Sequence, residues 1–96
     1  MLEEDPFQLM LFVRGNTARS ASTIHRVRGA CDTFPNGARA LRIVDVFQEP
    51  QLVQKYRVVA TPTLVTVGRR GERRFVGDVS EQDVQECFAG ELDDER

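Results

Sequence analysis

The side chains in this sequence that could do chemistry on their own are two cysteines and one histidine. Cys31 and Cys87 are far apart, and neither has a second cysteine close by, so the sequence contains no C-x-x-C redox pair. Together with the single His25 they are too few and too scattered for a metal site or a disulfide framework. The sequence therefore predicts two free, partly buried thiols, no bound metal and no dithiol redox chemistry.

Hydroxyl groups gather in the stretch RGNTARSAS, residues 14–22, but none has an obvious base beside it. A serine or threonine nucleophile needs an adjacent base, and His25 lies about two turns further on if this stretch opens a helix. We therefore predict cap and surface hydroxyls, no catalytic residue, no cofactor and no enzymatic activity. One alternative stays open. Gly15 and the helix start could hold a glutathione-type anion on backbone N–H groups, in a small enzyme or ligand binder.

Arginines are concentrated later in the chain. Four of them occur within six residues: Arg69, Arg70, Arg73 and Arg74. Arg57 comes shortly before them. One interpretation is a solvated hairpin whose charges protect a sheet edge, and the other is a docking patch for an acidic protein surface. Nucleic acid is not expected as a partner, because the net charge is -2 and no aromatic residues alternate with the basic ones.

The composition is that of one globular domain. The 96 residues are 41% hydrophobic and 29% charged, enough for one modest core. We expect a single domain over residues 1–96, with an ordered core at about 7–90 and an acidic tail, ELDDER, at 91–96. No signal-peptide pattern and no membrane-length apolar run is present, which predicts a cytoplasmic protein with no membrane partner.

The first half of the sequence reads as strand, helix, strand. Residues 8–13, QLMLFV, form a continuous apolar run typical of a buried strand, and Asn16 or Thr17 can cap the helix that follows. An apolar stripe at helical spacing predicts which helix residues face the core: Ala18, Ala21, Ile24, Val27, Cys31 and Phe34. Pro35-Asn36-Gly37 ends the helix, and residues 40–46, ALRIVDV, predict a second, parallel strand.

The second half adds a short helix, a hairpin and a last helix. Glu49-Pro50 opens the short helix, with Leu52, Val53 and Tyr56 facing inward. Strands at 63–67 and 73–76 flank a hairpin loop at 68–71. Ser80 and Asp83 predict a capping box before a last helix at 81–89. The residues of this helix that we expect to face inward are Val84, Cys87 and Phe88. The order βαβαββα is that of an α/β, thioredoxin-like fold with a four-stranded mixed sheet.

Pro62, in the turn Ala60-Thr61-Pro62-Thr63, is compatible with a cis peptide bond. In thioredoxin-type redox proteins this turn lies beside the active site and receives an extended peptide. Because this sequence lacks the cysteine pair, we expect the turn to bind a peptide or protein, and we do not expect it to take part in electron transfer.

Four blocks together resemble the KaiB family of circadian clock proteins: LFVRGNT (residues 11–17), ALRIVDV with EPQL (40–52), ATPTL (60–64) and RRFVGDVS (73–80). The resemblance implies a non-enzymatic adaptor that binds the KaiC-type ATPase. It also implies further partners, a KaiA-like protein and a sensor histidine kinase whose N-terminal domain is itself KaiB-like. The segment VQKYRVVA, residues 53–60, looks closer to that kinase-type domain, so a KaiB-like sensory domain is the alternative.

The resemblance further implies two folds and a set of site residues. The family's ground state, commonly a tetramer, rearranges in its second half to a thioredoxin-like monomer that binds the ATPase, and two such packings differ by about a few kcal/mol. For this chain the resemblance implies a possible homo-oligomer, a dimer or tetramer. Pro62, Gly77 and Asp78 match positions of the turn and of the segment that rearranges. The basic residues that match the partner-binding surface are Arg42, Arg57, Arg73 and Arg74. The family's basic residue in the early first helix falls at Ser22 or Thr23 here, with Arg19 and Arg26 as substitutes.

Overall fold

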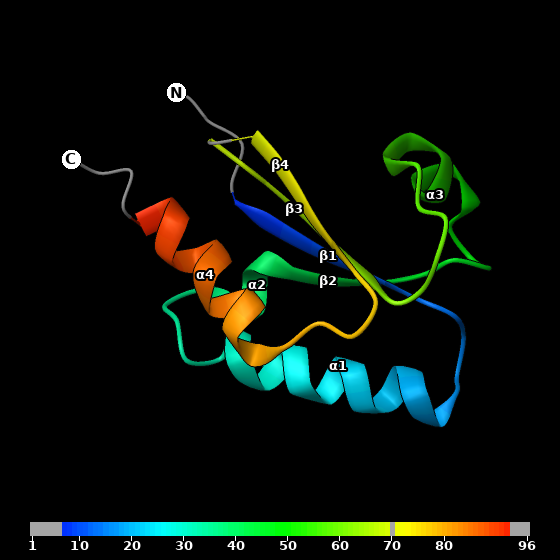
Figure 1. The fold of residues 1–96 in the computed structure, drawn as a ribbon, viewed down its shortest axis with the longest axis horizontal. Helices are drawn as coiled ribbons and strands as arrows, with labels where there is room; N and C mark the ends of the chain where they lie inside the picture. The colour runs from blue at the N-terminus through cyan, green and yellow to red at the C-terminus, as the bar shows by residue number, and fades with distance from the viewer. Residues whose placement is uncertain (1–6, 70, 93–96) are drawn as a thin grey trace.

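The computed structural model describes residues 7–69 and 71–92. Its elements are β1 (Gln8–Val13), α1 (Ala18–Cys31), α2 (Gly37–Ala40), β2 (Leu41–Asp45), α3 (Pro50–Tyr56), β3 (Thr63–Gly68), β4 (Gly71–Val76) and α4 (Glu81–Leu92). The predicted order βαβαββα is confirmed, and the short helix α2 is added to it. Figure 1 shows the sheet between α1 and α4 on one side and α3 on the other.

The four strands form one mixed sheet in the order β2-β1-β3-β4. β1 pairs with β2 in parallel, while the β1–β3 and β3–β4 pairs are antiparallel. This confirms the predicted parallel pair and the antiparallel hairpin. The carboxyl ends of β1, β2 and β4 therefore lie at the same end of the sheet as the start of β3. We call this the strand-end side of the molecule.

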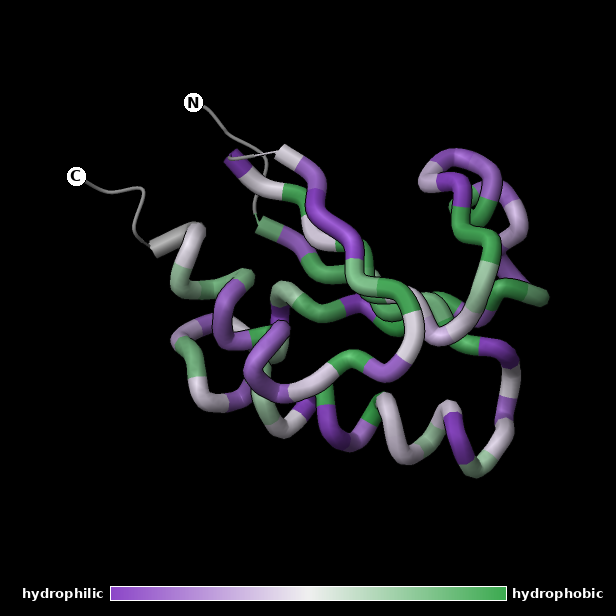
Figure 2. The backbone as a smooth tube through the Cα atoms, viewed as in Figure 1, coloured by the Kyte–Doolittle hydropathy of each residue, from purple (hydrophilic) through white to green (hydrophobic). Residues whose placement is uncertain are grey.

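Two apolar clusters lie on opposite faces of the sheet, because successive strand residues point to opposite sides. The larger cluster joins Leu9, Leu11 and Val13 of β1 to α1, β3 and α4. The smaller one joins Met10 and Phe12 to Val44, Val58 and Val65, with α3 residues packed against it. Figure 2 shows the hydrophobic strands enclosed between the helices. Leu52, Val53 and Tyr56 face this cluster as predicted, but no residue of α3 is fully buried.

The predicted apolar stripe of α1 was wrong at its start. Ala18 and Ala21 are exposed, and Ser20 and Thr23 are buried in their place, at 7% and 1% exposure. These hydroxyls can be buried because they are satisfied locally: Thr23 Oγ1 donates to the Arg19 carbonyl, and Ser20 Oγ accepts from Thr17 Oγ1. Thr17 caps α1, as predicted, by accepting from the Ser20 N–H at 3.0 Å.

Several boundaries also differ from the predictions. α1 ends at Cys31 rather than at Pro35, and Phe34 then stacks on Phe88 of α4 with ring centroids 4.4 Å apart. α4 runs to Leu92, past the predicted end at Ala89 and into the predicted acidic tail, whose residues 93–96 lie outside the described part. β3 reaches Gly68 and β4 begins at Gly71, so the hairpin is tighter than expected; Arg70 is not described.

The start of α4 has the predicted capping box. The Ser80 N–H donates to Asp83 Oδ2, and the Asp83 N–H donates to Ser80 Oγ, both at 3.0 Å. Val84, Cys87 and Phe88 are buried as expected. No helix in the described residues is both long enough and apolar enough to cross a membrane.

Candidate functional site

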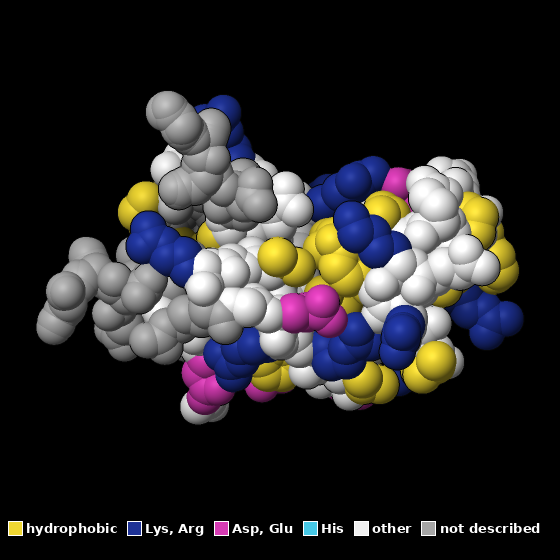
Figure 3. Space-filling model, turned by 90° about the horizontal axis from the view of Figure 1, so that it is seen from above, with side chains coloured by type: hydrophobic (Ala, Val, Ile, Leu, Met, Phe, Trp, Pro, Cys, Tyr) yellow, Lys and Arg dark blue, Asp and Glu magenta, His cyan; other side chains and the backbone are white. Residues whose placement is uncertain are grey.

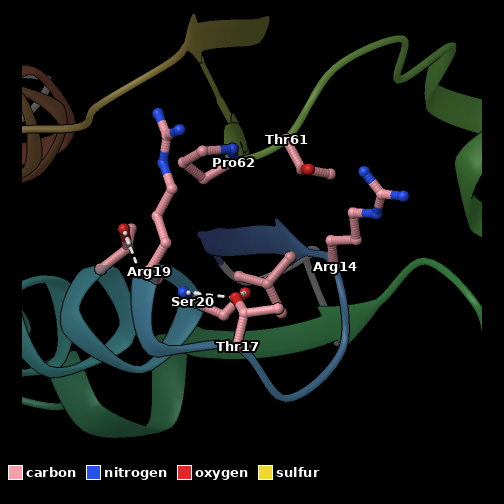
Figure 4. A pocket seen from close by; sticks show the side chains of 8 residues that line it. Arg14, Thr17, Arg19, Ser20, Thr61 and Pro62 are labelled. Atoms are coloured by element: carbon pink, nitrogen blue, oxygen red, sulfur yellow. Dashed lines mark hydrogen bonds between the residues drawn. The ribbon is translucent and has the colours of Figure 1, made fainter.

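A pocket of about 280 Å³ opens where β1 leads into α1. It is lined by Val13, Arg14, Thr17, Arg19, Ser20, Thr23, Thr61 and Pro62. Figure 4 shows Arg14 and Arg19 extending on opposite sides of it, with Thr61 and Pro62 across from Thr17 and Ser20. The Thr61–Pro62 peptide bond is cis, the isomer with which the sequence was compatible.

The pocket is lined by two guanidinium groups, those of Arg14 and Arg19, and by the hydroxyls of three threonines and one serine. The hydroxyls of Thr17, Ser20 and Thr23 form hydrogen bonds in the cap and first turns of α1, and neither a thiol nor a histidine is among the lining residues. His25, which the sequence offered as the only base, is an exposed residue of α1 and does not line the pocket. The described residues also hold no group of three His, Cys, Asp or Glu side chains that could bind a metal ion.

The two cysteines are free and buried, as predicted, and lie away from the pocket. Burial raises the pKa of the Cys31 thiol from 9.0 to about 11, with further contributions from Asp32 and Cys87. Burial also raises the pKa of Cys87, although Arg73 and a hydrogen bond with Thr66 oppose the shift. Thiols with raised pKa values are poor nucleophiles at neutral pH, so both behave as core residues.

Arg74 is tied to the end of α3. From β4 its guanidinium donates to the Tyr56 carbonyl at 2.5 Å and to the Arg57 carbonyl at 3.2 Å, and it also contacts Glu72 at 3.0 Å. Arg57 itself is the left-handed C-cap of α3, with φ 54° and ψ 49°. A cation at the carboxyl end of a helix is favourable, because the last carbonyl groups lack partners within the helix.

Arg42 and Arg73 lie apart from this pair. Arg42 is on the edge strand β2 and forms an ion pair with Glu49. The strand register aligns Arg42, Met10, Val65 and Arg74 across one face of the sheet, so Arg42 and Arg74 mark opposite edges of the face that carries α3. Arg73 points to the other face, where its guanidinium lies 5.3 Å from the centre of the Phe75 ring.

The three residues predicted from the turn and the rearranging segment are close together. The Gly77 N–H donates to the Pro62 carbonyl at 2.9 Å, and Gly77 has φ 94°, a conformation suited to glycine. Asp78 forms an exposed ion pair with Arg19 at 3.3 Å. Arg26 donates to the Val79 carbonyl at 2.9 Å, so the connection between β4 and α4 is held on α1 by two arginines.

Sequence reasoning missed a set of exposed apolar residues at the strand-end side: Phe47, Val59 and Val76. It also missed Arg14, whose guanidinium lies 5.8 Å from the centre of the Phe47 ring. The signal available was the apolar Phe47 directly after the second strand, in a stretch otherwise rich in polar and turn residues.

Comparison with known proteins gives a consistent set of relatives. The KaiB domain family matches residues 10–90. A circadian clock oscillator protein KaiB from Picosynechococcus sp. is 35% identical over 77 residues, covering 80% of this chain and 74% of that protein. A protein of the same name from Prochlorococcus marinus is 32% identical over 83 residues, covering 86% and 79%.

Solved structures share the fold. The N-terminal domain of Synechococcus elongatus SasA superposes with a TM-score of 0.73 and 27% identity, covering 100% of this chain and 92% of that domain. A thioredoxin from Fasciola hepatica has a TM-score of 0.71 at 22% identity, covering 88% and 80%, which shows the common fold alone.

Proposed function

The chain belongs to the KaiB family, and from this premise we propose that it is a protein-binding adaptor without catalytic activity of its own. It docks on a KaiC-type ATPase and modulates circadian or related signalling. The observation that carries the proposal is the basic face around α3, formed by Arg42, Arg57 and Arg74.

This basic face suits an acidic partner. Figure 3 shows Lys and Arg side chains around a hydrophobic patch, with acidic side chains at the edge of the patch. Arg42 and Arg74 already have acidic neighbours in Glu49 and Glu72, whereas Arg57 forms no ion pair with the described residues. A carboxylate of the partner would therefore gain most at Arg57, because no internal ion pair has to be broken there.

Arg73 has a different place in the proposal. It shares the edge strand β4 with Arg74 but points to the face that carries α4. It reaches the same partner only where that partner extends around the β4 edge. We therefore expect charge reversal at Arg73 to weaken docking less than charge reversal at Arg57.

Gel filtration and biolayer interferometry with a KaiC-type ATPase test the proposal. A complex is expected in at least one nucleotide state, and Arg57→Glu should weaken it by about tenfold, mainly through a slower association rate. Arg28→Glu, an exposed position on α1 away from this face, is the matched control and should stay within about twofold of wild type. If no complex forms in any nucleotide state, the adaptor proposal is wrong.

A second packing of the chain is part of the proposal. Its support is the segment Gly77–Asp78, which connects β4 to α4. Gly77 has a positive φ, and the ion pair that Asp78 forms with Arg19 is exposed. Two sets of slowly exchanging amide signals in NMR spectra, with a ratio that Gly77→Ala alters, are expected if the chain has both KaiB folds. Sedimentation then assigns a monomer, dimer or tetramer to each set.

A role like that of the kinase-type KaiB-like domain is the second candidate, favoured by the similarity to the SasA domain over the whole chain. A single set of amide signals that Gly77→Ala leaves unchanged, together with ATPase binding, would support this candidate. The enzyme alternative would return only if glutathione-transfer or thiol–disulfide activity were found and were lost in Ser20→Ala.

A further inference from the structure

Three large hydrophobic side chains are exposed in the described part of the chain, and all three lie at the strand-end side. Phe47 is 66% exposed, Val59 92% and Val76 59%. Phe47 follows β2, Val59 precedes β3 and Val76 ends β4, and the strand directions bring these three positions to the same end of the sheet. Because β2 and β4 are the two edge strands, Phe47 and Val76 lie toward opposite edges of this end of the sheet, and Val59 lies in the connection from α3 to β3. Large apolar side chains that are exposed at one end of a molecule are candidates for an interaction surface.

Phe47 is exposed but held in place. Its N–H donates to Asp45 Oδ1 at 2.9 Å, which fixes the turn after β2. The ring lies over Gly15, where an added Cβ would be 3.7 Å from two ring atoms, and the Arg14 guanidinium lies 5.8 Å from the ring centre. An aromatic side chain that is already ordered loses little entropy when a partner covers it, which suits a binding anchor.

Two charged groups lie beside Phe47: the Arg14 guanidinium at its ring and the Asp45 carboxylate that accepts from its N–H. Arg14 is exposed, lines the pocket at the start of α1, and forms no ion pair with any described residue. Arg19, across the same pocket, is paired with Asp78. Arg14 therefore offers a guanidinium that can take a carboxylate of a partner without breaking an internal ion pair.

From these observations we infer that Arg14, Phe47, Val59 and Val76 form a second docking surface, which we call the strand-end surface. Its occupant is a short acidic and apolar segment of a partner protein. Apolar side chains of that segment cover Phe47 and the two valines, and a carboxylate meets Arg14. This surface borders the basic face around α3, because Val59 is two residues from Arg57. Its binding to a short segment requires no ATPase, so it is tested independently of the proposed function.

NMR titration of the ¹⁵N-labelled protein with the peptide acetyl-Glu-Leu-Glu-Gly-Leu-Glu-amide tests this inference. Saturable shifts are expected at the amides of residues 14, 47, 59 and 76, with weak affinity. Phe47→Ala and Arg14→Glu should each weaken binding by about fivefold, which corresponds to the loss of one anchor contact. Both residues are exposed, and the dispersion of each variant's spectrum reports whether it is folded.

Two controls decide the chemistry of the occupant. The peptide with lysine in place of each glutamate should not bind. Arg39→Glu lies on α2, which leads into the opposite end of β2, and should leave the affinity unchanged. No saturable shift at about 5 mM peptide, equal binding of the lysine peptide, or shifts confined to the basic face around α3 would each overturn the inference. If the Phe47→Ala variant no longer binds the peptide but still binds the ATPase, the peptide and the ATPase bind to different surfaces.

Discussion

Gly37 is the residue on which the tight return of the chain after α1 depends. Its N–H donates to the Phe34 carbonyl at 2.9 Å, and a Cβ built on it would lie 1.8 Å from the Cys31 carbonyl oxygen. That oxygen is backbone and cannot move aside without shifting the end of α1. Glycine is required here by the close approach of two backbone segments, not by an unusual φ.

Gly37→Ala should therefore lower the free energy of unfolding by about 3 kcal/mol or more, through the backbone shift that it forces. Gly29→Ala is the matched control, because nothing lies within 4 Å of its added Cβ and it sits inside α1. The control should raise stability by about 0.5–1 kcal/mol through helix propensity. Urea titrations of both variants measure the difference, and equal midpoints would show that the chain relaxes at Gly37 at little cost.

Cys31 gives the stability of the protein a dependence on alkaline pH. Its pKa is raised from 9.0 to about 11 in the folded state by burial, so the folded state favours the neutral thiol. This contribution is fully present below pH 9 and is lost as the pH rises through about 11, because the unfolded thiol ionises first. The loss amounts to roughly 2–3 kcal/mol over that window.

Urea midpoints at pH 8 and pH 10.5 measure this effect. The wild type should lose stability between the two pH values, and Cys31→Ala should lose less, although its midpoint at pH 8 is lower because a buried side chain has been shortened. If the two proteins lose stability in parallel, the pH dependence comes from other groups.

At the scale of the elements, α3 depends on a side chain from another strand. It has seven residues, none fully buried, and its last carbonyls accept hydrogen bonds from Arg74 of β4. A helix this short has little stability of its own. Arg74 therefore joins α3 to the sheet edge, in addition to any part it takes in docking.

Arg74→Met keeps the aliphatic stem and removes the charged donors, so it should cost about 1–2 kcal/mol of stability. Arg73→Met is the matched control from the other face of β4 and should cost less than about 0.5 kcal/mol. Urea midpoints and amide exchange of α3 report the difference. Full stability of Arg74→Met with loss of ATPase binding would instead assign Arg74 to docking alone.

The elements could be predicted well from the sequence where the signal is local. The capping box of Ser80 and Asp83, the strand of residues 8–13 and the proline at the start of α3 each depend on neighbours in the chain. The buried face of α1 could not be predicted in this way. The hydrogen bonds of Ser20 and Thr23 are local, but which face of the helix turns toward the sheet is set by tertiary packing. Nor could the contact of Arg74, since its partners lie 17 and 18 residues away.

Sequence reasoning named candidate binding residues, which stay a prediction, and it could not say which of them share a surface. Arg57 and Arg74 meet because β4 passes the end of α3, and Arg73 is removed from them by the alternation of strand side chains. Phe47 was overlooked because an apolar residue after a strand is usually buried, and only the fold shows that most of its side chain is exposed.

For the molecule as a whole, the two faces of the sheet are covered unequally. α1 packs against α4 over one face, with a cluster that includes Phe88 and Val27, whereas the other face has only α3. The face with thin cover also carries the proposed basic docking surface. Local opening requires least energy where few apolar side chains are buried.

Amide hydrogen exchange should therefore be slower in the central strands than in α3. The buried central strands β1 and β3 are expected to exchange only through global unfolding, and α3 with the residues up to 60 through a smaller local opening. The urea dependence of exchange separates the two, because global unfolding exposes more surface and so has the steeper slope. Bound ATPase should slow exchange in α3 if that face is covered. If the amides of α3 are as protected as those of β1 in the free protein, the sheet and α3 open as one unit. The face of the sheet that α3 covers would then be rigid before any partner binds.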